Sequence, residues 1–271
     1  MREHWSVFKL QVRRKMPKAL LVFFFVMVAG ILGYLILGFR HNDAAEMQKF
    51  LDDIVVGDAM TETIEKAPRS FANGGSSVYL EILCVIGFFG VAWACVDFPV
   101  KKFRTAYTVR RLQTSETSLF WWDALINSAL FLAMWACAIA LIFIAGRIYE
   151  SGAGFVEGPQ GIAASIARNA FYRGVVPIAY PWVALRNVVA AICCGFACAG
   201  ASYRIRNRMM PVLETVILVA VLFAIPFAID RYTMDQKAVF WSIVSGWLWK
   251  IPLVVLACVL VVRDSRRRKE A

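Results

Sequence analysis

The sequence predicts an all-α integral membrane protein: a single transmembrane domain over residues 1–271 with six transmembrane helices and an N-terminal amphipathic interfacial helix. Of the 271 residues, 60% are hydrophobic and 18% are charged, whereas soluble domains average roughly 45–50% apolar and about 25% charged residues. The apolar residues gather in six long runs, and clusters of lysine and arginine flank those runs. A soluble fold of this length cannot bury so large an apolar fraction, so we expect lipid to surround the helices.

The six apolar runs have the length that a bilayer requires. At about 1.5 Å of rise per residue, each run crosses a hydrocarbon core of about 30 Å. The predicted spans cover about residues 19–39, 77–97, 120–146, 185–203, 211–230 and 239–262. The first run follows a basic stretch, but it is too long for a signal peptide and no small-residue cleavage site follows it, so we expect it to remain as an anchor.

The distribution of basic residues predicts the orientation. Segments 1–18, 98–119, 204–210 and 263–271 together hold 19 of the 30 lysine and arginine residues. Short cytoplasmic segments of membrane proteins are enriched in these residues. We therefore expect a multi-pass protein of the cell membrane with both termini in the cytoplasm. The net charge of +11 lies at helix ends, which argues against nucleic acid as a partner.

Two segments are predicted to lie outside the cell. Residues 40–76 are polar and net acidic, and residues 147–184 begin with several glycines and then become moderately apolar. The second segment is compatible with a short helix at the outer interface. Its aromatic anchors at the headgroup level would be Phe171, Tyr172, Tyr180 and Trp182.

The N-terminal segment 1–18 has the pattern of a basic amphipathic helix. Spacings of three and four residues place one apolar stripe along a helix, with Arg13 to one side of it. The stripe consists of Trp5, Phe8, Val12 and Met16. Such a helix before a membrane span is expected to lie flat at the cytoplasmic interface, close to anionic headgroups. The alternative is a frayed polar tail.

No pattern in the chain indicates catalysis, a bound cofactor or a metal. The chain lacks the phosphate-binding, dinucleotide-binding, zinc-protease and serine-hydrolase motifs. The two histidines, His4 and His41, have no nearby partner for nucleophilic chemistry. All seven cysteines fall within apolar runs, and the C-C-x-x-x-C stretch at 193–198 has no histidine or carboxylate beside it, so we interpret it as helix packing.

The loop at 98–119 is the most informative part of the sequence. Its basic and aromatic residues suggest a short amphipathic helix that faces the cytoplasm, and Thr114 or Ser115 is placed to cap the next helix. The simpler interpretation is a basic loop that touches lipid headgroups.

This loop resembles that of a known family of bacterial membrane proteins. The run Y-T-V-R-R-L-Q-T-S-E-T-S-L-F-W-W, between the second and third of six spans, is similar to the cytoplasmic loop of ABC type-2 exporter permeases. The resemblance implies separate nucleotide-binding subunits that bind ATP and magnesium, a second permease chain as a homodimer or heterodimer partner, and export of a lipid-like, peptide or drug-like substrate. It assigns the ATPase-subunit interface to Arg104, Tyr107, Arg110, Arg111, Leu112, Thr114, Ser115, Glu116 and Thr117.

Charged residues within the predicted spans are the second set of candidates, because a charge at the bilayer centre costs about 2.5–3.5 kcal/mol or more. They are Glu81, Asp123, Arg186, Glu214 and Lys250. A Glu81–Arg186 pair is plausible, and so are contacts of Asp123 or Glu214 with arginines of the loop. Lys250 is the deepest, and it is expected to line a substrate path, to snorkel, or to meet a partner chain.

The fourth span carries small residues at intervals of four, namely Ala191, Gly195 and Ala199. This spacing allows close helix approach, and packing within the chain is favoured over a dimer seam. Two other functional classes remain as alternatives to the permease. One is a stand-alone secondary transporter, although the chain shows no internal repeat. The other is a non-transporting accessory or immunity-type membrane protein.

Overall fold

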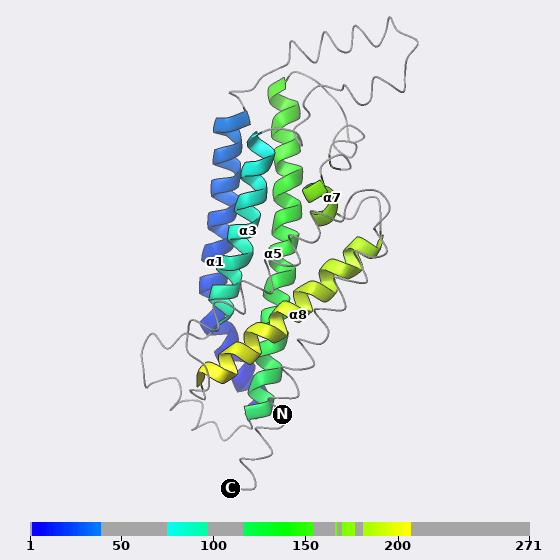
Figure 1. Ribbon diagram of the computed structural model, residues 1–271. Helices are drawn as coiled ribbons and strands as arrows, with labels where there is room; N and C mark the ends of the chain where they lie inside the picture. Colours follow the sequence, from blue (N-terminus) through cyan, green and yellow to red (C-terminus); the bar gives the residue numbers. More distant parts are fainter. Residues whose placement is uncertain are drawn as a thin grey trace, which may run out of the picture. The chain divides into compact units, whose positions relative to one another are not determined.

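The computed structural model describes residues 2–38, 75–96, 116–153, 166, 170–176 and 181–206. The helices are, in chain order, α1 (Arg2–Gly38), α3 (Gly75–Cys95), α5 (Glu116–Ala153), α7 (Ala170–Val175) and α8 (Pro181–Arg206), as Figure 1 shows. No strand occurs within these ranges. The described part of the chain is therefore helical, as the sequence predicts.

Four of the helices are long and apolar enough to cross a membrane. The candidate spans are Ser6–Ile36, Val78–Cys95, Thr117–Ile148 and Ala184–Tyr203. They overlap the first four predicted spans, although the first of them begins at Ser6 and not near residue 19. The fifth and sixth predicted spans, at 211–230 and 239–262, lie outside the described residues, and so does most of segment 40–76.

The helix ends differ from the predicted loop boundaries. Helix α5 begins at Glu116, so Glu116 and Thr117 form its first turn and do not close the preceding loop. The same helix continues to Ala153, past the predicted outer end of the span at residue 146. Helix α8 begins at Pro181, where the missing N–H of proline is not needed. Apolar run length detects the part of a helix that lipid covers, whereas the hydrogen-bonded helix continues through polar residues on either side.

Helix α1 is continuous from Arg2 to Gly38 with Pro17 inside it. A separate interfacial helix over residues 1–18 is therefore not confirmed. The buried positions in this part follow a spacing of four residues that differs from the predicted apolar stripe: Val7, Gln11, Lys15 and Ala19. Met16, a member of the predicted stripe, is 43% exposed. Lys15 accounts for this difference. Its buried ammonium group pairs with Asp123 of α5, so the side of α1 that carries Lys15 faces α5.

The chain divides into two compact units. Unit 1 contains Met1–Phe23, Gly87–Trp135 and Ala184–Ala271, and unit 2 contains Phe24–Ile86 and Ala136–Val183. Helices α1, α3 and α5 each contribute one part to unit 1 and another part to unit 2.

In unit 1, α8 crosses α5 at a point of close approach (Figure 1). A Cβ atom added to Gly195 would lie 2.7 Å from the Cα atom of Ser128 on α5. Only glycine allows the two backbones to come so near. One turn further along α8, Ala199 is buried in a cluster with Phe120 and Ala124 of α5. The predicted small-residue packing of the fourth span is thus found within the chain, against α5.

In unit 2, α1 and α3 are joined by an aromatic side chain. The hydroxyl of Tyr79 donates a hydrogen bond of 2.8 Å to the carbonyl oxygen of Ala29. Its ring fills the space beside Gly33, where an added Cβ atom would overlap it. On the other side, a Cβ atom at Gly30 would lie 2.7 Å from the methyl groups of Leu141. Glycines on α1 therefore make room for larger side chains of α3 and α5.

The short helix α7 does not present Tyr172 as an interfacial anchor. This side chain is fully buried, and its ring centroid lies 5.8 Å from that of Phe171. Burial, together with the nearby Tyr34, raises the pKa of the Tyr172 hydroxyl well above its ordinary value, so it remains protonated. The prediction for Tyr172 was wrong because helix α7 turns this residue inward. Tyr180 and the side chain of Trp182 lie outside the described residues.

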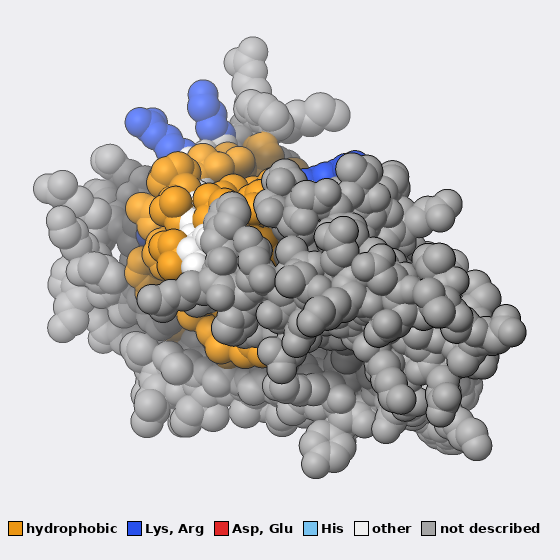
Figure 2. Space-filling view, turned by 90° about the horizontal axis from the view of Figure 1, so that it is seen from above, with side chains coloured by type: hydrophobic (Ala, Val, Ile, Leu, Met, Phe, Trp, Pro, Cys, Tyr) orange, Lys and Arg blue, Asp and Glu red, His pale blue; other side chains and the backbone are white. Residues whose placement is uncertain are grey.

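Many exposed side chains of the long helices are large and apolar. On α1 they include Leu21 at 69%, Phe24 at 71% and Ile36 at 67% exposure. Figure 2 shows hydrophobic side chains over most of the described surface on one face, with lysine and arginine at its margins. A continuous apolar surface of this kind is unfavourable in water and favourable in lipid. The described helices are thus compatible with a location in a membrane.

Candidate functional site

A buried polar cluster lies in unit 1, among the apolar side chains of three helices. Helix α1 contributes two of its side chains and α5 contributes three. The polar cluster consists of Gln11, Lys15, Asp123, Asn127 and Ser128, each at most 8% exposed. Polar groups in such surroundings are costly unless they bond to one another, which makes these five side chains the candidate site.

An ion pair forms the centre of the polar cluster. The Nζ atom of Lys15 lies 3.0 Å from Oδ1 of Asp123 and 2.8 Å from Oδ1 of Asn127. Lys15 is 1% exposed and Asp123 is fully buried. Asp123 and Asn127 are four residues apart on α5, so both oxygen atoms face the same side of that helix. The lysine therefore joins α1 to two successive turns of α5.

The cluster extends from α5 to α8. The amide nitrogen of Asn127 donates a hydrogen bond of 3.4 Å to the carbonyl oxygen of Gly195. The Ser128 hydroxyl lies 2.7 Å from the carbonyl oxygen of Ala124 in its own helix and 3.3 Å from that of Ile192 on α8. Asn127 accepts from Lys15 through its oxygen and donates to α8 through its nitrogen, so one side chain connects the three helices.

Gln11 is the exception in the cluster. It lies one turn before Lys15 and is 1% exposed, and among the described residues neither its amide nitrogen nor its amide oxygen has a hydrogen-bond partner. Close by in sequence, the ring of Phe8 lies 5.3 Å from that of Trp122 on α5. A buried amide without a partner is destabilising. Gln11 therefore does not contribute to the stability of the described helices.

We expect Gln11→Met to raise the stability of the purified protein by about 1–2 kcal/mol, because methionine has a similar shape and no polar group to desolvate. The measurement is the midpoint of thermal unfolding in detergent. Gln11→Glu serves as the opposite control, since it adds a second buried negative charge beside the Lys15–Asp123 pair and should lower the midpoint. A lower midpoint for Gln11→Met would mean that the amide has a bound partner such as water.

The structure places the predicted intramembrane charges in different surroundings. Asp123 is in the polar cluster, where its partner is Lys15. Glu81 is half-buried on α3 in unit 2. Arg186 is buried in unit 1, and its Nε and Nη2 atoms donate bonds of 3.3 Å to Oδ1 of Asn187. The Glu81–Arg186 pair stays a prediction. Glu214 and Lys250 lie outside the described residues.

The other predicted residues belong to the N-terminal segment and the loop. Phe8 and Val12 are half-buried, Arg13 is exposed, and the side chain of Trp5 is not among those described. The loop residues outside the described ranges are Arg104, Tyr107, Arg110, Arg111, Leu112, Thr114 and Ser115. The proposed contacts of loop arginines with Asp123 or Glu214 therefore stay predictions.

Sequence reasoning missed four members of the polar cluster: Gln11, Lys15, Asn127 and Ser128. It assigned Lys15 to the basic cluster at the cytoplasmic end of the first span. A spacing signal was present, because Gln11 and Lys15 are four residues apart, as are Asp123 and Asn127. Asp123 and Asn127 stand in an apolar run, which indicates a polar helix face, whereas Gln11 and Lys15 stand in a basic stretch that hid their role.

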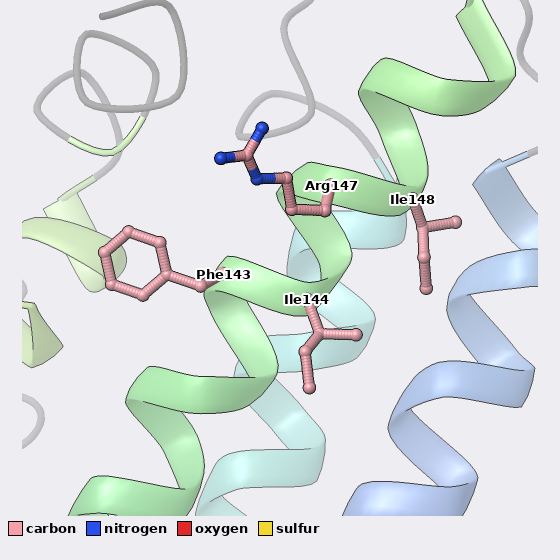
Figure 3. A pocket seen from close by; sticks show the side chains of 4 residues that line it. All are labelled: Phe143, Ile144, Arg147 and Ile148. Carbon is pink, nitrogen blue, oxygen red and sulfur yellow. The ribbon is translucent and has the colours of Figure 1, made fainter. Parts of the chain in front are cut away.

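One hollow in the described surface lies on α5 in unit 2. It has a volume of about 390 Å³ and is lined by Phe143, Ile144, Arg147 and Ile148. Figure 3 shows Phe143 and Arg147 extending from one side of the helix and the two isoleucines from the other. All four residues come from a single helix, so this hollow lacks the converging polar groups that define a binding site.

Within the described residues, no group of three or more histidine, cysteine, aspartate or glutamate side chains is placed to hold a metal ion. The cysteines in that part of the chain form no disulfide. Comparison with known proteins adds no relative: no protein-family model matches the chain, and no curated protein or solved structure is significantly similar to it.

Proposed function

We propose that the chain is the transmembrane permease subunit of an ATP-driven exporter of the ABC type. In this proposal it crosses the membrane six times, with both termini in the cytoplasm and the N-terminal part of α1 at the cytoplasmic interface. Separate nucleotide-binding subunits bind ATP and magnesium and dock on the loop that follows α3. A second permease chain completes a pathway for a lipid-like, peptide or drug-like substrate.

The observation that carries the proposal is the position of the polar cluster relative to this loop. Helix α5 begins at Glu116, directly after the loop, and Asp123 lies about two helical turns later. A displacement of the loop would move the first turns of α5. The ion pair with Lys15 would then transmit the movement to α1, and the bond from Asn127 to Gly195 would transmit it to α8.

The end of α3, from which the loop begins, also contacts α8. The hydroxyl of Ser202 lies 2.9 Å from the carbonyl oxygen of Cys198 and 3.5 Å from that of Cys95, the last residue of α3. Both helices that flank the loop therefore contact α8 in unit 1. This arrangement supports a loop that acts on several helices together, which rigid-body transmission from an ATPase subunit requires.

A charge reversal in the loop tests the proposal. We expect Arg110→Glu/Arg111→Glu to reduce co-purification of a soluble ATPase by at least about tenfold, because the proposed contact relies on the positive charge of the loop and the reversal would turn attraction into repulsion. Membrane insertion, measured by the amount of detergent-extracted protein, should not change.

The matched control is Lys9→Glu/Arg13→Glu, which makes the same charge change at two exposed positions of α1 and should leave ATPase binding intact. An ATPase retained by the loop variant, or transport without any ATPase, would contradict the proposal. Transport by the chain alone would favour a secondary transporter.

A further inference from the structure

A second feature of unit 1 combines cations, an indole ring and exposed apolar side chains on one side of α1 and α3. The Nζ atom of Lys18 lies 5.6 Å from the centroid of the Trp93 ring. This distance allows a cation–π interaction. Trp93 remains 56% exposed, and Lys18 is also exposed. Both side chains thus keep surface that a partner outside the chain can contact.

Further cationic and exposed apolar side chains lie near Lys18 on α1 and near Trp93 on α3. Arg14 lies four residues earlier, on the same side of the helix. Leu21, one turn after Lys18, is 69% exposed, and Phe89, one turn before Trp93 on α3, is 37% exposed. These five residues, Arg14, Lys18, Leu21, Phe89 and Trp93, form what we name the cation–indole face.

The two helices approach each other closely beside this face. A Cβ atom added to Gly90 of α3 would lie 2.9 Å from a methyl group of Val22 on α1. The contact holds Lys18 and Trp93 next to each other, since Val22 is one turn after Lys18 and Gly90 is about one turn before Trp93. The cation–indole face therefore rests on a packed pair of helices.

We propose that the cation–indole face binds an anionic phospholipid. The phosphate-bearing headgroup would lie between Arg14 and Lys18, where a guanidinium and an ammonium group supply several N–H donors to phosphate oxygens. Tryptophan favours the headgroup level of a bilayer. The acyl chains would follow the exposed surfaces of Leu21 and Phe89 into the hydrocarbon layer.

Charge selects the kind of partner. The described side chains of α1 at 6–36 and of α3 at 87–96 include no aspartate or glutamate. An isologous contact with a second copy of this face would place like cations against one another, which is unfavourable. The cytoplasmic leaflet carries the opposite charge, and the basic clusters of the sequence predict that this end of the helices is cytoplasmic. A lipid therefore satisfies both the charge and the apolar surface.

The test measures lipids bound to the full-length chain by native mass spectrometry in a mild detergent. Phosphatidylglycerol and phosphatidylcholine with identical acyl chains are titrated separately. For the unchanged protein, we expect phosphatidylglycerol to be retained preferentially. For Arg14→Gln/Lys18→Gln, we expect its affinity to fall by about fivefold per cation removed, whereas phosphatidylcholine binding should not change.

The matched control is Lys9→Gln/Arg13→Gln, which removes two exposed cations from the same helix on another side. It should retain the preference for phosphatidylglycerol. Lys18→Gln and Trp93→Leu, each alone, should weaken phosphatidylglycerol binding, and they serve if the double variant does not fold.

Three results would overturn the proposal. If both double variants lost the same phosphatidylglycerol affinity, the net charge of the helix and not the cation–indole face would determine binding. Equal binding of the two lipids by the unchanged protein would exclude headgroup recognition. A loss of dimer with unchanged lipid binding would assign the face to a second copy of the chain. None of these measurements involves an ATPase, so their outcome is separate from that of the loop experiment.

Discussion

Replacing Lys15 with methionine is expected to lower the free energy of unfolding by about 3–5 kcal/mol, because the fully buried carboxylate of Asp123 would lose its counter-charge. Asn127 would also lose the donor that its oxygen accepts. The change is small in volume, so the effect would come from electrostatics and not from a cavity. In a thermal unfolding experiment on the detergent-extracted protein, the midpoint should fall by roughly 10 °C.

Two control variants separate this mechanism from a general loss of charge. Lys9→Met removes an exposed cation from the same helix and should change stability by less than about 0.5 kcal/mol. The double variant Lys15→Met/Asp123→Leu removes both charges and should recover most of the lost stability, since an apolar pair can replace a buried ion pair. If the double variant is as unstable as the single one, the ion pair is not the reason for the loss.

The second large effect is expected at the contact between α8 and α5. Gly195→Ala would place a methyl group against the backbone and hydroxyl of Ser128. Backbone atoms cannot rotate away as a side chain can, so α8 would have to move from α5. We expect a loss of about 3 kcal/mol, the upper part of the range for overpacked cores. The bond from Asn127 to the carbonyl oxygen of Gly195 should weaken with it.

Gly90→Ala is the matched control for this contact. It adds the same methyl group to another helix–helix approach in unit 1, but there the nearest atoms belong to the side chain of Val22, at 2.9 Å. A side chain can adjust, so the loss should be distinctly smaller than at Gly195. The measurement is the thermal midpoint of both variants under identical conditions. Equal losses would contradict the assignment of Gly195 as a backbone contact.

The polar cluster and the loop make separate contributions to the proposed mechanism. The loop would supply the surface that an ATPase subunit binds, whereas Lys15 and Asp123 would act as positioning residues that hold α1 against α5. A charge-swapped pair, Lys15→Asp/Asp123→Lys, should fold better than either single variant, because it restores an ion pair between the two helices. In a coupled transporter, the single variants would also separate ATP hydrolysis from transport, which a loss of stability alone would not do.

Much of the fold could be predicted from local features of the sequence. The first four spans were located by apolar run length, since a helix that lipid surrounds must be apolar over about 20 residues. The packing role of Gly195 followed from small residues at intervals of four. The helix ends were less predictable, because Glu116 and Thr117 are polar residues that are nevertheless helical, and apolar run length carries no information on them.

The sequence by itself determined that the described part of the chain is helical and where four apolar helices lie, because both depend on residues close together in the chain. Only the tertiary structure decided that the charge of Lys15 is buried and which charge it meets. Lys15 and Asp123 are separated by 108 positions, and no local pattern encodes a partner at that distance. Their pairing results from the way α1, α5 and α8 pack, which shields both charges from solvent and brings them within 3.0 Å of each other.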